Sequence, residues 1–254
     1  VPHGINSETF KPLEKNDSKL LDFKKKIFKE KEYEYVLFYN NRNIQRKRVS
    51  DIILAYRSFC DSLSKEDADK CCFLLHTSPV DPNGTDLNAV IEAFCPDYNI
   101  VFSNNKLNPN EMNMLYNISD VVVNNASNEG FGLSHAEGLM AGRVLINNVT
   151  GGLQDGCKFM DDDGNTVTFN DEWGSNNDGR YKKCGKWIKP VFPAARQLHG
   201  SPATPYLFDD HTKWEEFAEA IMYWYLKTPD ERKECGLAGR EFALNEGGLN
   251  SKNM

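Results

Sequence analysis

Apolar residues gather in five short runs along the first 150 residues of the chain. The runs occupy residues 35–39 (YVLFY), 72–76 (CFLLH), 100–103 (IVFS), 120–124 (DVVVN) and 144–147 (VLIN). Each run is continuous, without the alternation of apolar and polar residues that marks a strand with one solvated face. Continuous runs of this length are typical of strands buried on both faces. The pattern therefore predicts five buried strands.

Segments with helical features separate these runs. Ser50 is expected to cap a helix, residues 86–94 fill the next gap, and Asn108 followed by Pro109 is a good N-cap and first helical residue. Residues 134–142 (SHAEGLMAG) follow the fourth run, and the chain is expected to be helical again from Asp210 onward. Strands that alternate with helices predict an α/β protein with a doubly wound, Rossmann-like parallel sheet.

The loops that follow the predicted strands are polar and rich in Asn and Gly. They read NNRN, TSPVDPNG, SNNKLN, NASNEGFG and NVTGG. Such residues are also ordinary turn formers. Five such loops together at the carboxyl ends of parallel strands favour a ligand site, because open α/β sheets bind ligands at that edge.

Residues 157–205 break the alternation of strands and helices. The segment is rich in turn residues and lacks a helical period, so it is interpreted as an insertion with a short hairpin around NTVTF (165–169). Its acidic run, Asp161 to Asp163, is a candidate set of metal ligands, although such a run is more often a solvated turn. The sequence offers no other metal site.

Composition and charge exclude several classes of protein. The 254 residues are 40% hydrophobic and 26% charged, with a net charge of −7, ordinary values for a globular protein. An acidic chain lacks the basic footprint that general nucleic-acid binding needs. No apolar run approaches 18 residues, and the first ten residues have no signal-peptide pattern. Association with a membrane is therefore not expected.

The seven cysteines point to a reducing compartment. Their number is odd, none falls in a CxxC pair, and the adjacent Cys71 and Cys72 are placed like small buried hydrophobic residues. Structural disulfides are rare in the cytosol. A cytoplasmic location is therefore the expectation.

The loop NNRNIQRKR gathers four cations before the first predicted helix. Arg42, Arg46, Lys47 and Arg48 would lie near the positive end of the helix dipole, where cations are unfavourable. A bound phosphate would offset that charge, since Arg and Lys both bind phosphate. A solvated basic loop, paired with nearby acids, is the alternative.

The stretch EGFGLSHAE (129–137) carries the second candidate anion site. Gly130 and Gly132 allow the backbone to approach a ligand, and a helix starting near Ser134 would offer free N–H groups. Glu137 has two interpretations: it completes a capping box with Ser134, or it accepts hydrogen bonds from a sugar diol. Glu129 has no capping role and is expected to point into a cleft. His135 is interpreted as a first-turn surface residue.

These residues resemble the retaining glycosyltransferases of family 4, which have the GT-B fold. The resemblance rests on four motifs in order: VPHGINSETFKP, NNRNIQRKR, the E-x7-E pattern from Glu129 to Glu137, and TGGLQD (150–155). It implies the C-terminal, donor-binding half of a two-domain enzyme. Residues 1–12 would be the inter-domain linker and residues 13–254 the nucleotide-sugar-binding domain, with the insertion at about 157–205.

The resemblance also implies roles for individual residues. Glu129 would be the catalytic residue beside the donor sugar, and Glu137 would bind the ribose. Lys106 would line the base pocket together with Leu107. The donor-binding residues would be Arg42, Lys47, Leu107, Gly130, Phe131, Gly132, Leu133, Ser134, Glu137, Gly151 and Gly152. The nucleotide-sugar is a substrate, so no cofactor is expected, and no metal is needed.

The sequence also departs from the family pattern. Asn41 replaces the usual glycine before the arginine, and the 157–205 segment is longer than usual. The N-terminal GT-B domain, which carries the acceptor site, is expected to be missing, so the chain alone would not transfer sugar. A non-enzymatic nucleotide-sugar-binding module and another GT-B enzyme, such as a sugar-nucleotide epimerase, remain alternatives. The nucleobase, sugar and acceptor stay open.

Overall fold

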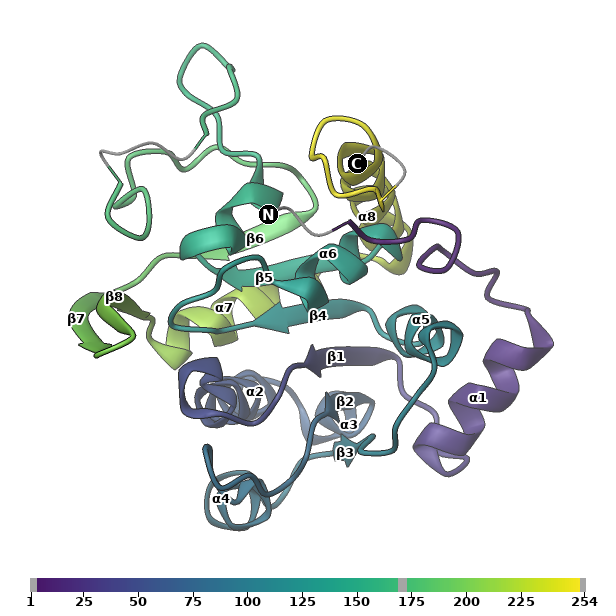
Figure 1. Ribbon diagram of the computed structural model, residues 1–254. Coiled ribbons are helices and arrows are strands. Elements are labelled where there is room, and N and C mark those ends of the chain that lie inside the picture. Colours follow the sequence, from purple (N-terminus) through teal and green to yellow (C-terminus); the bar gives the residue numbers. More distant parts are fainter. Residues whose placement is uncertain (1–3, 169–172, 252–254) are drawn as a thin grey trace.

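The centre of the molecule is a six-stranded parallel sheet, shown in Figure 1. The computed structural model describes residues 4–168 and 173–251. The strand order is β3-β2-β1-β4-β5-β6. The strands are β1 (Tyr35–Asn40), β2 (Cys71–His76), β3 (Ile100–Phe102), β4 (Val121–Asn124), β5 (Val144–Asn148) and β6 (Ile188–Val191). The predicted doubly wound α/β fold is confirmed.

Helices cover both faces of this sheet. One core cluster joins the sheet to α1 (Ser18–Phe28), α5 (Pro109–Asn117), α6 (Leu133–Met140) and α8 (Pro229–Leu244). The other joins the sheet to α2 (Val49–Asp61), α3 (Lys65–Asp69), α4 (Leu87–Phe94) and α7 (Trp214–Tyr225). Strand β1 shows the division: Val36 and Phe38 belong to the first cluster, and Leu37 and Tyr39 to the second. Burial on both faces explains why the strands read as continuous apolar runs.

The strand order changes direction between β1 and β4. The chain runs outward from β1 to β2 and β3, and then returns to place β4 on the other side of β1. At such a switch point the connections on the two sides diverge, which leaves a crevice at the carboxyl ends of the strands. The loop after β1 and the loop after β4 both open into it.

The segment interpreted as an insertion also supplies the edge strand of the sheet. Residues 188–191 (IKPV) form β6, which the sequence pattern missed because Lys189 and Pro190 interrupt the apolar run. The hairpin expected around NTVTF is limited to one antiparallel bridge between Met160 and Thr166, flanked by backbone hydrogen bonds from Val167 to Phe159 and from Asp161 to Asn165; Phe169 lies outside the described residues.

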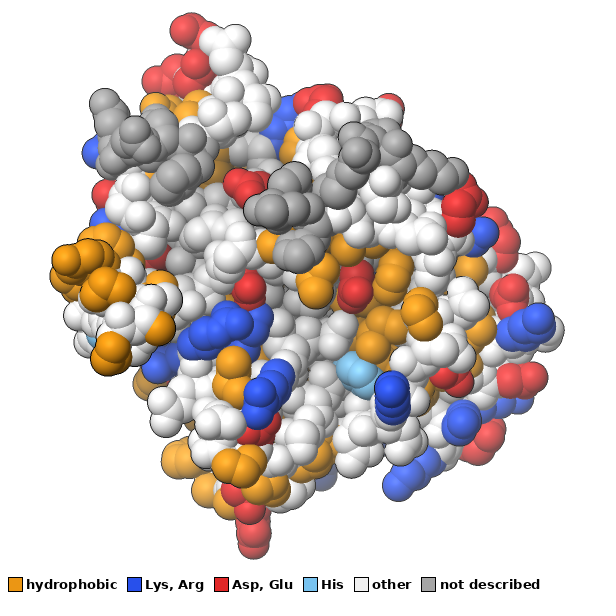
Figure 2. All heavy atoms as spheres, viewed as in Figure 1, with side chains coloured by type: hydrophobic (Ala, Val, Ile, Leu, Met, Phe, Trp, Pro, Cys, Tyr) orange, Lys and Arg blue, Asp and Glu red, His pale blue; other side chains and the backbone are white. Residues whose placement is uncertain are grey.

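A longer hairpin, which the sequence analysis did not predict, consists of β7 (Ala195–Ser201) and β8 (Thr204–His211), which pair antiparallel apart from the sheet (Figure 1). Its strands carry exposed Leu198, Tyr206 and Phe208. Figure 2 shows hydrophobic side chains gathered on this edge of the molecule. Residues 210 and 211 therefore end a strand, and the helix expected after Asp210 begins at Trp214.

Helix starts follow the sequence signals in two cases and depart from them in a third. Asn108 caps α5 in a full capping box with Glu111, and Asp86 caps α4. Ser50 is not a cap, because Arg48, which follows a short 3-10 helix, η1 (Gln45–Lys47), has a left-handed backbone and is the N-cap of α2, two residues earlier than expected.

The two ends of the described chain meet beside α8. Ile5 bridges to Asn250, and the guanidinium of Arg240 on α8 donates hydrogen bonds to the carbonyls of Ser7 and Phe10. Residues 4–10 are thus held against the C-terminal helix. Among the described residues, no helix is both long and apolar enough to cross a membrane.

Candidate functional site

A cavity of about 870 Å³ opens at the carboxyl edge of the sheet, beside the switch point. Its size suits a nucleotide-sized ligand. Four segments contribute to its wall, and the lining residues are Asn41, Arg46, Lys47, Glu129, Gly130, Phe131, Gly132, Leu133, Asp155, Gly247, Gly248 and Leu249. The cavity therefore brings together the basic loop and the first half of the E-x7-E stretch, as expected.

Glu129 lies between two cations of the basic loop. One of its oxygens, Oε2, accepts hydrogen bonds from Lys47 Nζ and, at 3.4 Å, from Arg46 NH1. The Lys47 and Glu129 side chains are only 8% and 11% exposed. Burial acts to raise the pKa of Glu129, but the two cations outweigh it and hold that pKa below its ordinary value. Burial lowers the pKa of Lys47, and the nearby Glu129 carboxylate partly offsets this decrease.

This pairing accounts for the positive charge that the sequence left uncompensated. Arg48 pairs with Asp51, and Arg42 pairs with Asp81, away from the cavity. Beside Glu129, the two cations Arg46 and Lys47 face this one carboxylate, so these three side chains carry one net positive charge. Asp155 also lines the cavity, and burial raises its pKa. The Oε1 atom of Glu129 has no hydrogen-bond partner among residues 4–168 and 173–251.

Asn41 links the basic loop to helix α6. Its Oδ1 accepts a hydrogen bond of 2.7 Å from Lys47 Nζ, and its Nδ2 donates to Ser134 Oγ at 3.3 Å. A glycine at this position would make neither contact. The residue that looked like a departure from the family pattern thus orients the buried lysine.

Helix α6 begins without a side-chain cap. Gly132 occupies the N-cap position with φ 85°, a left-handed conformation that favours glycine, and no side chain bonds the first amides. The capping-box interpretation of Ser134 and Glu137 is therefore wrong, because both residues lie inside the helix. Ser134 is buried and accepts from Asn41 and Asn124. The first turn of α6 keeps its N–H groups facing the loop at 129–132, an arrangement that suits an anion.

Glu137 accepts hydrogen bonds from neutral groups only. Its Oε2 accepts hydrogen bonds from Tyr116 Oη at 2.7 Å and from Asn40 Nδ2 at 3.4 Å. Asn40 also donates a hydrogen bond to Tyr116. Burial raises the pKa of Glu137 to about 7, with the Tyr116 hydrogen bond acting weakly in the other direction. Its Oε1 has no partner in the described part of the chain. Sequence reasoning missed Asn40 and Tyr116, which come from two distant segments.

Gly151 and Gly152 support the Glu129 loop from behind. The Gly152 N–H donates to the Glu129 carbonyl at 2.8 Å. A Cβ atom on Gly151 would overlap that same carbonyl oxygen, and one on Gly152 would overlap the carbonyl of Gly130. Only glycine permits this approach of two backbones, so the TGGLQD loop fixes the Glu129 loop whether or not it also contacts a ligand.

Six predicted donor-binding residues lie outside the cavity lining: Arg42, Leu107, Ser134, Glu137, Gly151 and Gly152. The Arg42 side chain is 62% exposed and is held by Asp81. Leu107 packs, partly buried, against the core cluster that includes α5. Arg46, which the resemblance did not single out, lines the cavity where an arginine was expected.

His135 is not a surface residue. It is 2% exposed, its Nδ1 is hydrogen bonded to the Asn147 amide, and its Nε2 has no partner among the described residues. Burial lowers the pKa of His135 to about 4. Gly156 packs directly against the imidazole. His135 is therefore a neutral core residue behind the site.

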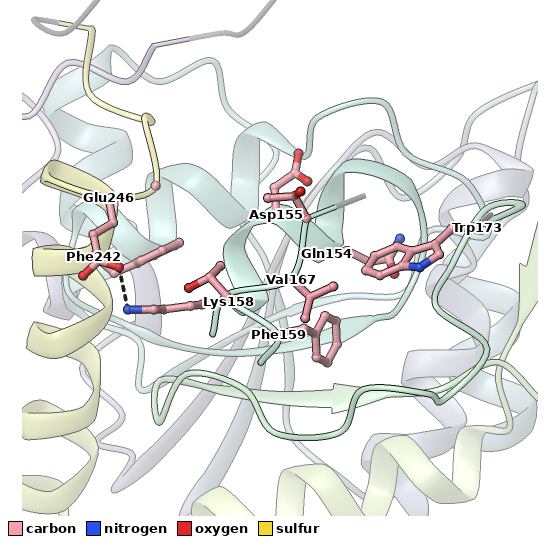
Figure 3. A pocket seen from close by; sticks show the side chains of 11 residues that line it. Gln154, Asp155, Lys158, Phe159, Val167, Trp173, Phe242 and Glu246 are labelled. Atoms are coloured by element: carbon pink, nitrogen blue, oxygen red, sulfur yellow. Dashed lines mark hydrogen bonds and ion pairs between the residues drawn. The ribbon is translucent and has the colours of Figure 1, made fainter. Parts of the chain in front are cut away.

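A second cavity, of about 380 Å³, adjoins the first (Figure 3). Asp155 and Gly247 belong to the walls of both cavities. In the second, Lys158 pairs with Glu246 at 2.5 Å, while Phe159 and Trp173 lie on the opposite side. Both aromatic side chains are buried.

The acidic run offers no cation site in the described residues. Asp161 accepts hydrogen bonds from the backbone and side chain of Asn165 across a turn. Within residues 4–168 and 173–251, no group of three His, Cys, Asp or Glu side chains is arranged to hold a metal ion.

The sheet, its two helical layers and the crevice at the switch point define a doubly wound, Rossmann-like domain. No family model matches the sequence, and no curated protein matches it. Solved structures do match the fold. The C-terminal domain of a group 1 glycosyl transferase (LpcC) from Francisella tularensis has 15% identity and a TM-score of 0.60, covering 96% of this chain and 98% of that one.

Two longer neighbours match this chain over about half of their own length. Sucrose-phosphate synthase from Thermosynechococcus elongatus has 15% identity and a TM-score of 0.64, covering 99% of this chain and 48% of that chain. Anabaena Alr3699/HepE in complex with UDP-glucose has 12% identity and a TM-score of 0.65, covering 98% and 54%. This chain thus spans about half their length. It has the fold of the C-terminal half of a GT-B glycosyltransferase, as predicted.

Proposed function

We propose that this chain is the donor-binding half of a retaining glycosyltransferase. It would bind a nucleoside diphosphate sugar, and the sugar would pass to an acceptor held by an N-terminal GT-B domain. The observation that carries this proposal is the convergence of Lys47, Arg46 and Glu129 on one cavity at the switch point of the sheet. Among the structural neighbours, Anabaena Alr3699/HepE was solved with UDP-glucose, and an E. coli trehalose-6-phosphate protein with UDP-2-fluoro glucose.

The cavity has the charge that a diphosphate needs. One net positive charge from Arg46, Lys47 and Glu129 faces the uncapped first turn of α6, whose dipole adds to it. A diphosphate placed there would be bound by both charge and backbone N–H groups. The same groups would stabilise the departing diphosphate, so the proposed reaction needs no metal ion.

The two glutamates would act at opposite ends of the donor. Glu137 would accept hydrogen bonds from the ribose hydroxyls through its unpartnered Oε1, next to Tyr116. Glu129, held by its Oε2, would present Oε1 to the donor sugar. The acceptor hydroxyl would attack from the face that the diphosphate leaves, which retains the configuration of the sugar.

A calorimetric titration of the chain with UDP, GDP and ADP tests this proposal. We expect one of the three to bind with at least tenfold preference, and Lys47→Met to abolish most of that affinity. A chain that is folded and binds none of the three would contradict the proposal.

Catalysis requires a second experiment, since it also needs an acceptor. The chain alone is expected to bind donor and transfer no sugar, because closure of a second wall is needed to hold the acceptor and exclude water. Fusion of a GT-B N-terminal domain ahead of residue 1 is expected to create transfer. Persistent binding without transfer in such a fusion would favour a non-enzymatic binding module.

The expected location follows from the thiols. All seven cysteines are free, and five of them are buried. Free thiols are kept reduced in the cytosol, so we place the protein in the cytoplasm.

A further inference from the structure

Strand β8 of the β7–β8 hairpin contacts the loop that carries Glu129. The backbone N–H of Asp210 donates to the Ser127 carbonyl at 2.7 Å. The side chains of Asp209 and Asp210 then extend to two different loops of the sheet edge. Neither the E-x7-E motif nor the basic loop gives any sign of this contact, because about 80 residues separate the partners.

Asp209 holds the loop directly before Glu129. Its Oδ1 accepts hydrogen bonds from Ser127 Oγ at 2.8 Å and from the Asn128 side-chain amide. Its other oxygen, Oδ2, faces outward and pairs with His199 Nδ1 at 3.0 Å. The Asp209 side chain is 17% exposed. The Asp209 carboxylate therefore binds the hairpin residue His199 with one oxygen and the loop before Glu129 with the other.

The same two loop residues also bind the basic loop. Arg46 NH1 donates to the Asn128 carbonyl at 2.8 Å, and the Ser127 N–H donates to the Arg46 carbonyl at 2.7 Å. Residues 127 and 128 thus lie between Asp209 and Arg46. A shift of this dipeptide would move Glu129 relative to both cations.

Asp210 binds a different set of residues. It is fully buried and accepts hydrogen bonds from Thr150 Oγ1 at 2.7 Å, Asn176 Nδ2 at 2.8 Å and Arg196 Nε at 3.2 Å. It fixes the hairpin to the loop after β5. Because loss of a buried carboxylate leaves three donors unsatisfied, its substitution is expected to destabilise the fold. The more exposed Asp209 is the residue that can be tested.

We propose that Asp209 is a positioning residue for Glu129, acting from the hairpin through Ser127 and Asn128. It holds the carboxylate of Glu129 against Lys47 and Arg46, with Oε1 turned to the cavity. Its effect on the donor sugar rests on the proposed function, but its effect on the Glu129 geometry does not.

Three variants separate the inner contact of Asp209 from its charge. Asp209→Ala removes both contacts. Asp209→Asn keeps an oxygen for Ser127 and Asn128, and its amide can donate to neutral His199. The matched control, His199→Ala, removes the outer contact alone. Thermal melting of each variant shows whether the fold is kept.

The first readout is the pKa of the Glu129 carboxyl, measured by carbon-13 NMR and assigned with Glu129→Gln. Removal of the negative charge of Asp209 would by itself lower that pKa. Release of Glu129 from its cations would raise it, by about one unit. We expect a rise in Asp209→Ala, and no rise in Asp209→Asn or His199→Ala. A folded Asp209→Ala variant in which the Glu129 pKa is unchanged or lower overturns the inference.

The second readout compares UDP-glucose with UDP by calorimetry. Asp209→Ala is expected to reduce the affinity advantage of UDP-glucose over UDP about tenfold, while the affinity for UDP changes less than about twofold. Asp209→Asn should restore the advantage. Equal losses for the two ligands would contradict the inference. Absence of any binding by the unmodified chain would count against the proposed function, and the NMR readout would still decide the role of Asp209.

Discussion

The two glutamates of the E-x7-E stretch occupy contrasting environments. Glu129 lies in a loop after β4, where Lys47 and Arg46 bind the same oxygen. Glu137 lies eight residues later inside α6, where Tyr116 and Asn40 are its partners. Both are largely removed from water. The first has a lowered pKa, and burial raises the pKa of the second to about 7.

The contrast shows that partners, more than burial, decide the charge of a carboxyl group in this site. Burial disfavours the ionised form of both residues, and only Glu129 has cations that reverse the effect. A pair of identical residues can therefore give one permanent anion and one group that exchanges its proton near neutral pH. The sequence spacing alone does not distinguish them.

Replacement of Lys47 by Met is expected to change the comparison most. It removes the closer cation and leaves Glu129 with Arg46 alone, so the net charge of this cluster falls from one positive charge to zero. We expect the affinity for a nucleoside diphosphate to fall about 100-fold, since a charged hydrogen bond contributes roughly 1.5–3 kcal/mol. The affinity for the nucleoside should hardly change. Calorimetry with both ligands checks this, and equal losses would show that Lys47 does not contact phosphate.

The pH dependence of stability should separate the two glutamates. Because the pKa of Glu137 is about 7 in the folded chain and about 4.3 when unfolded, the folded chain binds more protons between these values. The free energy of unfolding should therefore fall as pH rises from about 4.3 to 7 and level off above 7. Linkage gives a total of about 3–4 kcal/mol. Urea unfolding of the chain and of Glu137→Gln measures it, and the variant should lack this slope.

Glu129→Gln is the matched control for that slope. The lowered pKa of Glu129 gives stability that is present above its unfolded pKa and is lost as pH falls through the folded pKa. Its replacement should therefore remove stability at neutral pH, whereas Glu137→Gln should not. If both variants lose stability at neutral pH, or if neither does, the two environments do not shift the pKa values of the two glutamates in opposite directions.

Glu137→Ala is expected to weaken nucleotide binding without a large loss of stability. The hydrogen bonds to a ribose diol are worth at least about 1.4 kcal/mol, which corresponds to tenfold in affinity. No cap is lost, since Gly132 starts the helix. Calorimetry and thermal melting together check this. A sharp drop in melting temperature with unchanged affinity would make Glu137 a structural residue, and Tyr116→Phe provides a control that keeps the carboxylate.

Arg42→Ala should have the smallest effect. Arg42 is mostly exposed, pairs with Asp81 and lies outside the cavity lining. Exposed ion pairs contribute about 0–1 kcal/mol, so we expect less than about threefold loss in diphosphate affinity. Arg46→Ala, tested beside it, should cost at least about tenfold. The reverse order would restore Arg42 to the diphosphate site that the family resemblance implied.

The sequence predicted the parts of the fold that depend on local pattern. The five apolar runs form strands: four are buried on both faces, and the edge strand β3 is partly buried. Asn108 caps α5 as its side chain allows. Strand β6 escaped prediction because its residues IKPV include Lys and Pro, which an edge position tolerates. The sequence also missed helix α1, which its Asp17 cap begins.

The sequence was enough to predict which loops form the candidate site, but not which side chains contact one another within it. The motifs identified Glu129, Lys47 and the glycines that line one cavity. Their roles as donor-binding residues stay predictions. The partners that tune them, such as Tyr116 for Glu137 and Asp209 beside Asn128, come from segments about 20 and 80 residues away. The buried state of His135 also depends on Gly156 and Asn147, which only tertiary packing brings near.

The close approach of Gly151 and Gly152 to the Glu129 loop limits how the site can move. The two backbones meet without room for one extra carbon, and a hydrogen bond joins Gly152 to Glu129. The loop after β4 cannot swing toward the loop after β5, and cannot leave it without breaking that bond. A displacement of one of these two loops therefore carries the other with it. The basic loop after β1 is hydrogen bonded to the same β4 loop through Arg46, Ser127 and Asn128, so three loops of the cavity wall are coupled to one another.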